Sequence, residues 1–302
     1  MSIAQQAPGR RRQHGGGRSL VPYLYVLPAT VLLVVFVALP LAQTVFYSFN
    51  DWDGLTAPEW VGLENYTRAI GDPDVRAAVA HALLLMLFYS VLPVSLGLVM
   101  AALLSRRRLP GMPFFRTVLF LPQIITLVVS GVAWRWMYAD DGVVNQLLRA
   151  VGLDGVTRAW LGDFTFALPA VGLVGIWVVF GFCIVLFVAG IAGIDETLYD
   201  AARVDGAGPV REFFNVTVPA LRPQIAIALT VTAIGGLRSF DVVYVTTGGG
   251  PGRATQVPAL LIYQLAFVEG RVGLAAAVAV VLTAVIVAVA VAARRLVSTE
   301  EA

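Results

Sequence analysis

Residues 274–293 read LAAAVAVVLTAVIVAVAVAA, a run of twenty residues without a charged side chain. The hydrocarbon core of a bilayer is about 30 Å thick, so a helix needs about 20 apolar residues to cross it. A backbone surrounded by lipid must satisfy its polar groups within its own segment, which favours an α-helix. This stretch therefore predicts a membrane-spanning helix.

Five further stretches of similar character occur earlier in the chain. Of the 302 residues, 58% are hydrophobic and only 13% are charged, whereas about 25% of residues are charged in soluble domains. We therefore predict an all-α fold, a polytopic membrane protein with six transmembrane helices. Besides the first stretch, the predicted spans are residues 24–46, 77–104, 118–138, 166–194 and 225–245.

The stretch 225–245 carries two charged residues, Arg238 and Asp241. They stand three positions apart, so on a continuous helix they share a face and can form an ion pair. An ionisable residue inside a span indicates function by default, whereas a structural ion pair near the outer end of the span is the simpler interpretation. The sequence leaves both interpretations open.

Arginine is distributed unevenly between the two sides that six spans define. It is concentrated in the N-terminal tail, after the second span and in the segment 195–223. Because cytoplasmic segments carry an excess of basic residues, we expect a multi-pass cell-membrane protein with both termini in the cytoplasm. We predict a disordered basic tail over 1–19, one six-helix membrane domain over 20–297 and a cytoplasmic tail over 298–302. The basic tail favours a topology signal over a nucleic-acid arm, so no nucleic-acid partner is expected.

Composition excludes several kinds of site. All 21 basic residues are arginine, so a phosphate-binding loop of the type G-x-x-x-x-G-K-[ST], which needs a lysine, is absent. His14, His81 and Cys183 do not stand at a spacing familiar for metal ligands. No Ser/His/Asp or Cys/His arrangement indicates a nucleophile. We therefore expect no catalytic residue, no metal and no directly bound cofactor.

The segment 195–223 reads DETLYDAARVDGAGPVREFFNVTVPALRP and has a pattern of its own. Asp195 suits a helix N-cap, and a short helix with a small, apolar face is expected after it. Asp205 and Gly206 end that helix, because glycine supplies the backbone freedom that a tight turn needs.

A second short helix is predicted after this turn. Pro209 suits the first helical position, and the apolar residues that follow give the helix one apolar face. Pro219 and Pro223 are expected to stop it before the next span. The segment therefore predicts two short helices at an angle, lying on the cytoplasmic surface.

This pattern resembles the cytoplasmic coupling loop of binding-protein-dependent importer permeases, which reads E-A-A-x-x-D-G-A and is followed by a phenylalanine and prolines. In that family the loop docks in a cleft of the ATPase subunit and transmits closure of the ATPase dimer to the spans. Asp200 stands where the family has a glutamate, which is one methylene longer. The resemblance implies an ATPase-coupling role for Asp200, Ala201, Ala202, Asp205, Gly206, Ala207, Phe213 and Pro219.

The resemblance covers nearly the whole chain and is closest to the maltose-type permeases of the sugar and glycerol-phosphate branch. Short motifs recur in the order that the family has. They are WVGLENY at 60–66, RTVLFLP at 116–122, Trp134 with Trp136, SFD at 239–241, TGGGP at 247–251 and GLAAA at 273–277.

The resemblance implies a permease subunit of an ATP-binding-cassette importer, translocating a sugar or related solute by alternating access. The implied partners are a second, related permease chain, two ATPase subunits that bind ATP and Mg²⁺, an extracytoplasmic solute-binding protein and membrane lipid. In such importers specificity lies largely in the binding protein, so the sequence does not name the solute.

A substrate path is expected between the spans on either side of the 195–223 segment, as in the family. A sugar needs polar groups that match its hydroxyls and an aromatic face for its ring. Glycines in membrane helices more often serve close helix packing, so the two interpretations stand side by side. The candidates for the path are Gly175, Trp177, Phe182, Thr232, Gly236 and Ser239.

Two other classes of membrane protein are alternatives. A secondary transporter driven by an ion gradient predicts charged or broken-helix ion sites at mid-membrane and an inverted repeat; apart from Arg238 and Asp241 the sequence shows neither. A membrane-embedded enzyme predicts histidines or carboxylates clustered on the spans, which the sequence does not show.

Overall fold

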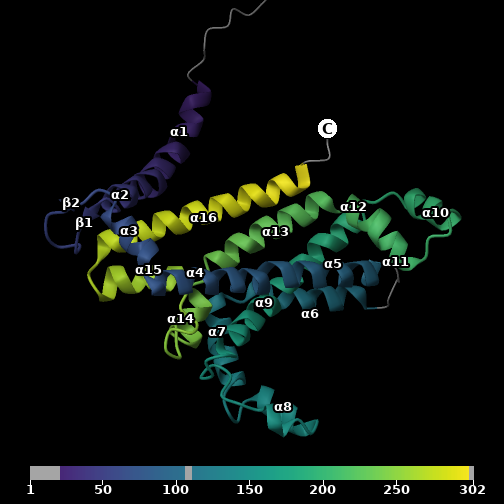
Figure 1. The fold of residues 1–302 in the computed structure, drawn as a ribbon. Helices are drawn as coiled ribbons and strands as arrows, with labels where there is room; N and C mark the ends of the chain where they lie inside the picture. The colour runs from purple at the N-terminus through teal and green to yellow at the C-terminus, as the bar shows by residue number, and fades with distance from the viewer. Residues whose placement is uncertain (1–20, 106–110, 299–302) are drawn as a thin grey trace, which may run out of the picture. The chain divides into compact units, whose positions relative to one another are not determined.

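The computed structural model describes residues 21–105 and 111–298, shown as a ribbon in Figure 1. The predicted tail over 1–19 lies outside the described residues, as does the predicted tail over 298–302 apart from its first residue. The chain forms two units, one up to Thr44 and one from Val45 onward. The prediction of a single domain over 20–297 therefore stays a prediction, and each unit is described by itself.

The N-terminal unit consists mainly of the first apolar helix. This helix is built from α1 (Val21–Leu33), the π-helical turn η1 (Val34–Ala38) and α2 (Leu39–Tyr47), which ends in the second unit. Its apolar part, Tyr23–Tyr47, is 25 residues long, and its large apolar side chains are exposed apart from the half-buried Tyr47. It is therefore long enough to span a membrane, as predicted for 24–46.

Three more of the predicted spans are single long helices. The second runs from Pro73 to Ser105 through α4 (Pro73–Met86), η2 (Leu87–Val91) and α5 (Leu92–Ser105). The fourth is α9 (Ala167–Ile191), and the sixth is α16 (Val272–Ser298). These helices confirm the predictions over 77–104, 166–194 and 274–293.

The span predicted over 118–138 is not one continuous helix. The chain forms α6 (Met112–Ile124) and α7 (Leu127–Met137). The helical stretches Thr117–Ile124 and Leu127–Met137 meet at a bend of 106°. Ile125 has an extended backbone, and the Thr126 hydroxyl accepts the N–H of Val129 to cap α7. Pro122 lacks the N–H that continued helix would need, which weakens α6 just before the break.

The prediction of one helix over 225–245 is also wrong. The chain forms α13 (Arg222–Leu237), a break at residues 238–240 and α14 (Asp241–Thr246). Glycines at 235 and 236 and the serine at 239 favour a helix less than alanine does, so the helix is easily interrupted here. Arg238 and Asp241 therefore do not share one helix face, and no ion pair joins them within the described residues.

Three of the π-helical turns stand two residues before a proline. Turn η1 precedes Pro40, η2 precedes Pro93, and η4 (Phe213–Thr217) precedes Pro219. A proline inside an α-helix lacks an N–H, and its ring collides with the carbonyl four residues earlier. A π turn widens the helix by one residue and moves that carbonyl, so the helix continues through the proline.

The segments 47–76, 139–165 and 246–272 connect the predicted spans on the side opposite the 195–223 segment, and we call them the first, second and third outer segments. They contain short elements that the sequence did not predict. Strands β1 (Asn50–Asp51) and β2 (Glu59–Trp60) pair antiparallel. Helices in these segments are α3 (Glu64–Gly71), α8 (Val143–Ala150), η3 (Asp154–Val156), α15 (Pro258–Tyr263) and η5 (Gln264–Val268).

The WVGLENY motif joins the first of these segments to the last helix. The buried Asn65 amide donates to the carbonyls of Ser48 and Asn50 at 3.1 and 2.8 Å. Gly273, near the start of α16, donates its N–H to the Trp52 carbonyl at 3.1 Å, and a side chain there would collide with the Asn50 carbonyl. The motif thus fixes how the first outer segment meets α16.

Helix α9 lies at the centre of the second unit and packs against α5, α6 and α13. Gly97 of α5 lies against Cys183, and Gly181 of α9 lies against the backbone of α6 at Leu119, so small residues permit both contacts. Helices α10 to α12, from the 195–223 segment, lie at the opposite end of the bundle from α3 and α15 (Figure 1).

Candidate functional site

The first arm of the 195–223 loop is α10 (Glu196–Val204). Its N-cap is Asp195, whose Oδ1 accepts the N–H of Thr197 at 2.9 Å, as predicted. This hydrogen bond favours the charged carboxylate and lowers the pKa of Asp195 below its usual value. The start of the loop is therefore fixed by local chemistry alone.

The turn after α10 is closed by two hydrogen bonds around a left-handed glycine. Gly206 has φ +75° and donates its N–H to Arg203 O at 3.0 Å, while Ala207 donates to Ala202 O at 2.9 Å. This pair of bonds is the Schellman arrangement, which needs a residue that tolerates positive φ. The predicted turn at Asp205 and Gly206 is confirmed.

The second arm runs through α11 (Pro209–Glu212), η4 and α12 (Val218–Ala220). Pro209 occupies the first helical turn, as predicted. The expectation that Pro219 and Pro223 stop the helix is wrong, because η4 accommodates Pro219 and Pro223 lies in the first turn of α13. The arm instead ends at Leu221, where the chain bends by 71° into α13.

Two side-chain contacts tie the arms together. The Tyr199 hydroxyl lies 3.0 Å from the Thr217 hydroxyl. Arg203 donates to the buried carboxylate of Glu212 at 3.2 Å and to Asp200 at 3.0 Å. The sequence analysis assigned a role to Asp200 but did not single out Tyr199, Thr217, Arg203 or Glu212. The opposite charges of Arg203 and Glu212 on the two sides of the glycine turn were a signal for their ion pair. The contacts make the loop one hairpin of two helices.

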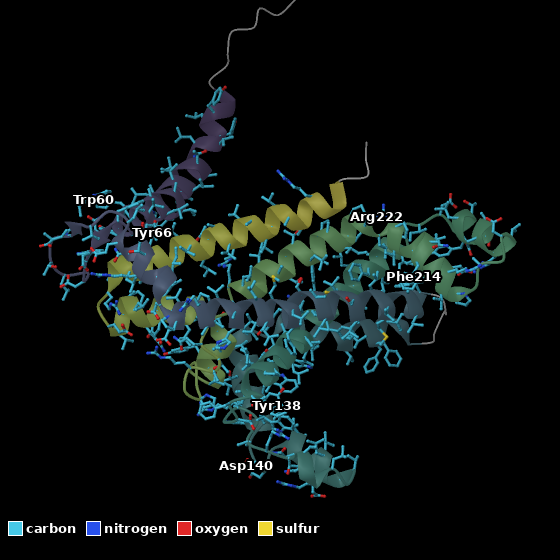
Figure 2. The ribbon with its side chains drawn as sticks, in the orientation of Figure 1. Trp60, Tyr66, Tyr138, Asp140, Phe214 and Arg222 are labelled. Carbon is cyan, nitrogen blue, oxygen red and sulfur yellow. The ribbon has the colours of Figure 1, made fainter. Side chains whose placement is uncertain are left out.

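The hairpin exposes apolar side chains at the end of the bundle where Figure 2 labels Phe214. We call the exposed side chains of Leu198, Val204, Val210 and Phe214 the hairpin patch; they are 51%, 88%, 70% and 62% exposed. Exposed apolar patches on proteins mark sites of contact with other proteins, membranes or ligands.

The predicted coupling residues surround this patch. Asp200, Ala201, Asp205 and Gly206 are exposed. Ala202, Ala207, Phe213 and Pro219 are half-buried. The structure therefore places all eight on the same hairpin, and their role in coupling stays a prediction.

We expect Glu212→Gln to loosen the hairpin. The change keeps the shape but removes the charge that holds Arg203, and since Arg203 is 56% exposed the loss is about 1 kcal/mol. Amide hydrogen exchange in α10 should then accelerate about fivefold. Glu196→Gln on the exposed first turn of α10 is the control, and equal exchange rates in both variants would contradict a role for the Arg203–Glu212 pair.

Three of the six path candidates meet the second span near η2. A side chain at Gly175 would collide with the Tyr89 ring, and one at Gly236 would lie 2.9 Å from Met86 Cα. Thr232 is buried and donates to the Ser90 hydroxyl at 2.7 Å. These two glycines therefore allow close packing, and Thr232 bonds to the adjoining helix.

The other three candidates lie apart from that contact. Trp177 packs edge-on against Trp134 of α7, with ring centroids 5.7 Å apart. Phe182 packs into the cluster around Cys183 and Phe187. Ser239, in the break after α13, is buried and its hydroxyl has no hydrogen-bond partner within the described residues. The assignment of all six candidates to a path stays a prediction.

Within residues 21–105 and 111–298, no three His, Cys, Asp or Glu side chains lie close enough together to hold a metal ion.

Comparison with known proteins gives one family match that covers most of the chain. Residues 93–299 match the family described as "Binding-protein-dependent transport system inner membrane component". The matched region runs from α5 to α16 and therefore contains the hairpin.

Individual relatives agree with this match. The chain is 38% identical to a probable ABC transporter permease protein, YurN, of Bacillus subtilis, over 87% of this chain and 90% of that one. It is 33% identical to the diacetylchitobiose uptake system permease protein NgcF of Streptomyces coelicolor, over 84% and 75% of the two chains. Its fold matches a bacterial ABC transporter that imports the acidic polysaccharide alginate, with TM-score 0.80, 21% identity and coverage of 94% and 97%.

Proposed function

This chain belongs to the family of binding-protein-dependent transport system inner membrane components, and from that membership we propose that it carries a saccharide across the cell membrane. It is a multi-pass permease subunit of an ABC importer. The single observation that supports the solute class is its 33% identity with a diacetylchitobiose uptake permease over 84% of this chain. In this proposal, the binding protein that delivers the solute determines which saccharide is carried.

Energy comes, in this proposal, from separate ATPase subunits that dock on the hairpin. The hairpin patch is apolar and exposed, as an interface core requires, and the chain has no lysine for a phosphate-binding loop of its own. ATP and Mg²⁺ are accordingly assigned to the ATPase subunits. A second, related permease chain and an extracytoplasmic binding protein complete the proposed assembly.

The hairpin is built to pass a displacement on to the spans. Its two arms are tied by Arg203 and Glu212, so they move together. Only Leu221 separates α12 from α13, and this fully buried side chain packs where a side chain at Gly190 of α9 would lie. A shift of the hairpin therefore acts directly on α13 and α9, the helices that carry the path candidates.

The proposed orientation places the hairpin and both termini in the cytoplasm. Its support is the excess of arginine in the segments assigned to that side and the position of α10 to α12 opposite α3 and α15 in Figure 1. The binding protein would then meet the end that carries α3 and α15.

Co-purification tests this assembly. The tagged chain, extracted from its native membrane in a mild detergent, should bring down an ATPase, a second permease and a binding protein identified by mass spectrometry. Val204→Asp, at a side chain that is 88% exposed on the hairpin patch, should reduce ATPase recovery at least about tenfold, since a buried unpaired charge costs several kcal/mol.

Leu55→Asp is the matched control, because Leu55 is 93% exposed in the first outer segment. It should leave ATPase recovery unchanged. Recovery of the intact wild-type chain alone would favour a self-sufficient secondary transporter, and equal recovery with both variants would remove the hairpin patch as the docking surface.

A further inference from the structure

Four aromatic rings, two from the end of the broken fifth span and two from the segment that follows it, form one continuous cluster. Phe240 and Tyr244 stack with centroids 5.2 Å apart. Tyr263 of α15 meets both rings edge-on at 5.6 and 5.7 Å, and Phe267 of η5 lies 5.5 Å from Tyr263. We call these four residues the aromatic cluster.

Two rings of the cluster pack against the core, and the other two are exposed; we call the exposed ones the presented rings. Phe240 and Tyr263 pack against the buried core around Leu85 and Val243. Tyr244 is 48% exposed and Phe267 is 79% exposed. The inner rings therefore hold the outer rings in place, which lowers the entropy that a ligand must remove on binding.

Polar groups accompany the presented rings. Asp241 stands three residues before Tyr244 on α14, so the carboxylate and the ring lie on one helix face. Asp241 is exposed and makes no hydrogen bond or ion pair within the described residues.

The neighbouring break in the fifth span adds an orphaned polar group. Ser239, next to Phe240, buries a hydroxyl without a partner in the part of the chain that the structure describes. The cluster thus presents exposed rings beside a carboxylate and near a buried hydroxyl. These groups match a solute that has both an apolar face and hydroxyl groups.

We propose that Tyr244, Phe267 and Asp241 form a docking platform for a saccharide at the end of the bundle opposite the hairpin. The C–H face of a sugar ring would lie on the presented rings, and its hydroxyls would donate to the Asp241 carboxylate. The platform rests on the proposed function, because it assigns the saccharide of that proposal a first contact on this chain. It lies beside the break that leads to α13, so a solute released there enters next to the path candidates.

The experiment uses the complete reconstituted transporter with its loaded binding protein. Diacetylchitobiose, maltose and trehalose are tried as solutes with the wild-type protein, and the one taken up is kept. Uptake and ATP hydrolysis are then measured together for Tyr244→Leu and Phe267→Leu. A saccharide platform predicts that solute transported per ATP falls about three- to tenfold, while stimulation of the ATPase by the binding protein is unchanged.

Three further variants sharpen this test. Trp136→Leu is the matched control, because Trp136 is an aromatic side chain 76% exposed on α7 outside the cluster, and it should change neither quantity. Tyr244→Phe keeps the ring and should retain most of the transport. Asp241→Asn removes the acceptor charge and should lower solute per ATP in the same way as the ring variants.

The outcomes separate this proposal from the proposed function. Failure of the wild type to take up any saccharide that its own binding protein binds would remove the saccharide function and the platform with it. Normal wild-type uptake with unchanged solute per ATP in both leucine variants would overturn the platform alone. An equal loss of ATPase stimulation and uptake would also overturn it, because the cluster would then dock a protein instead of a solute.

Discussion

Gly206→Pro should abolish solute uptake while the chain still inserts into the membrane in normal amount. Proline fixes φ near −65°, whereas Gly206 has φ +75°, and proline also lacks the N–H that Gly206 donates to Arg203 O. Both hydrogen bonds of the turn are then lost, and the second arm of the hairpin leaves its position. The measurement is uptake by the assembled transporter, normalised to the amount of chain in the membrane.

A matched control stands two residues further along. Gly208 has φ −78° and open space where a side chain would lie, so Gly208→Ala should transport normally. Gly206→Asn should retain part of the activity, since asparagine tolerates the left-handed region better than other side chains do. Normal uptake by Gly206→Pro would count against any role of the hairpin in coupling.

Gly181→Ala should lower the yield of folded protein more than any other single methyl group added to α9. The new Cβ would collide with the Leu119 carbonyl oxygen and lie 2.8 Å from Phe120 Cα, both backbone atoms of α6. Backbone cannot move aside as a flexible side chain can, so we expect a cost of about 3 kcal/mol. This corresponds to a fall of about 10 °C in the thermal midpoint of the detergent-solubilised protein.

Gly235→Ala provides the comparison for this loss. Gly235 lies in α13 with nothing near the position of a new Cβ, so alanine should be neutral or slightly stabilising there. Size-exclusion profiles and thermal midpoints of the two variants should therefore differ clearly. Similar midpoints would mean that α6 and α9 are less tightly packed than the structure has them.

Local chemistry explains which predictions were confirmed. Long uncharged runs are sufficient to predict α9 and α16, because membrane length sets helix length. Asp195 and Gly206 were predicted correctly, because a cap and a left-handed turn depend only on residues within a few positions. The same holds for Pro209 at the start of α11.

The missed features depend on contacts between distant segments. The breaks in the third and fifth spans place α14 against α7, and this packing carries no periodic signal in either segment. The Arg203–Glu212 pair requires two helices to fold back on each other before the charges meet. Ring clusters such as that of Tyr244 and Tyr263 join residues nineteen positions apart, which composition cannot reveal.

The path candidates show most clearly what could not be predicted from the sequence. Gly175 and Gly236 were chosen because glycine offers space, but the structure fills that space with Tyr89 and Met86. A glycine in a sequence does not say whether a cavity or a neighbouring helix occupies the room it leaves. Ser239 differs, since its hydroxyl is buried without a described partner.

The π turn in the second span resets the phase of that helix. Buried positions in α4 follow ordinary helical spacing at 75, 78, 82 and 85, and those in α5 do so at 94, 97 and 101. Across η2 the buried positions are 89 and 90, followed by 93 and 94, so two neighbouring residues face inward on each side of the wider turn. The second span, Pro73–Ser105, meets α13 mainly with α4 and α9 mainly with α5. Because the π turn absorbs one extra residue, deleting one residue within η2 would give a regular α-helix that keeps both faces, whereas converting η2 to an α-helix without a deletion would rotate α5 by about 100° and turn its wrong side toward α9.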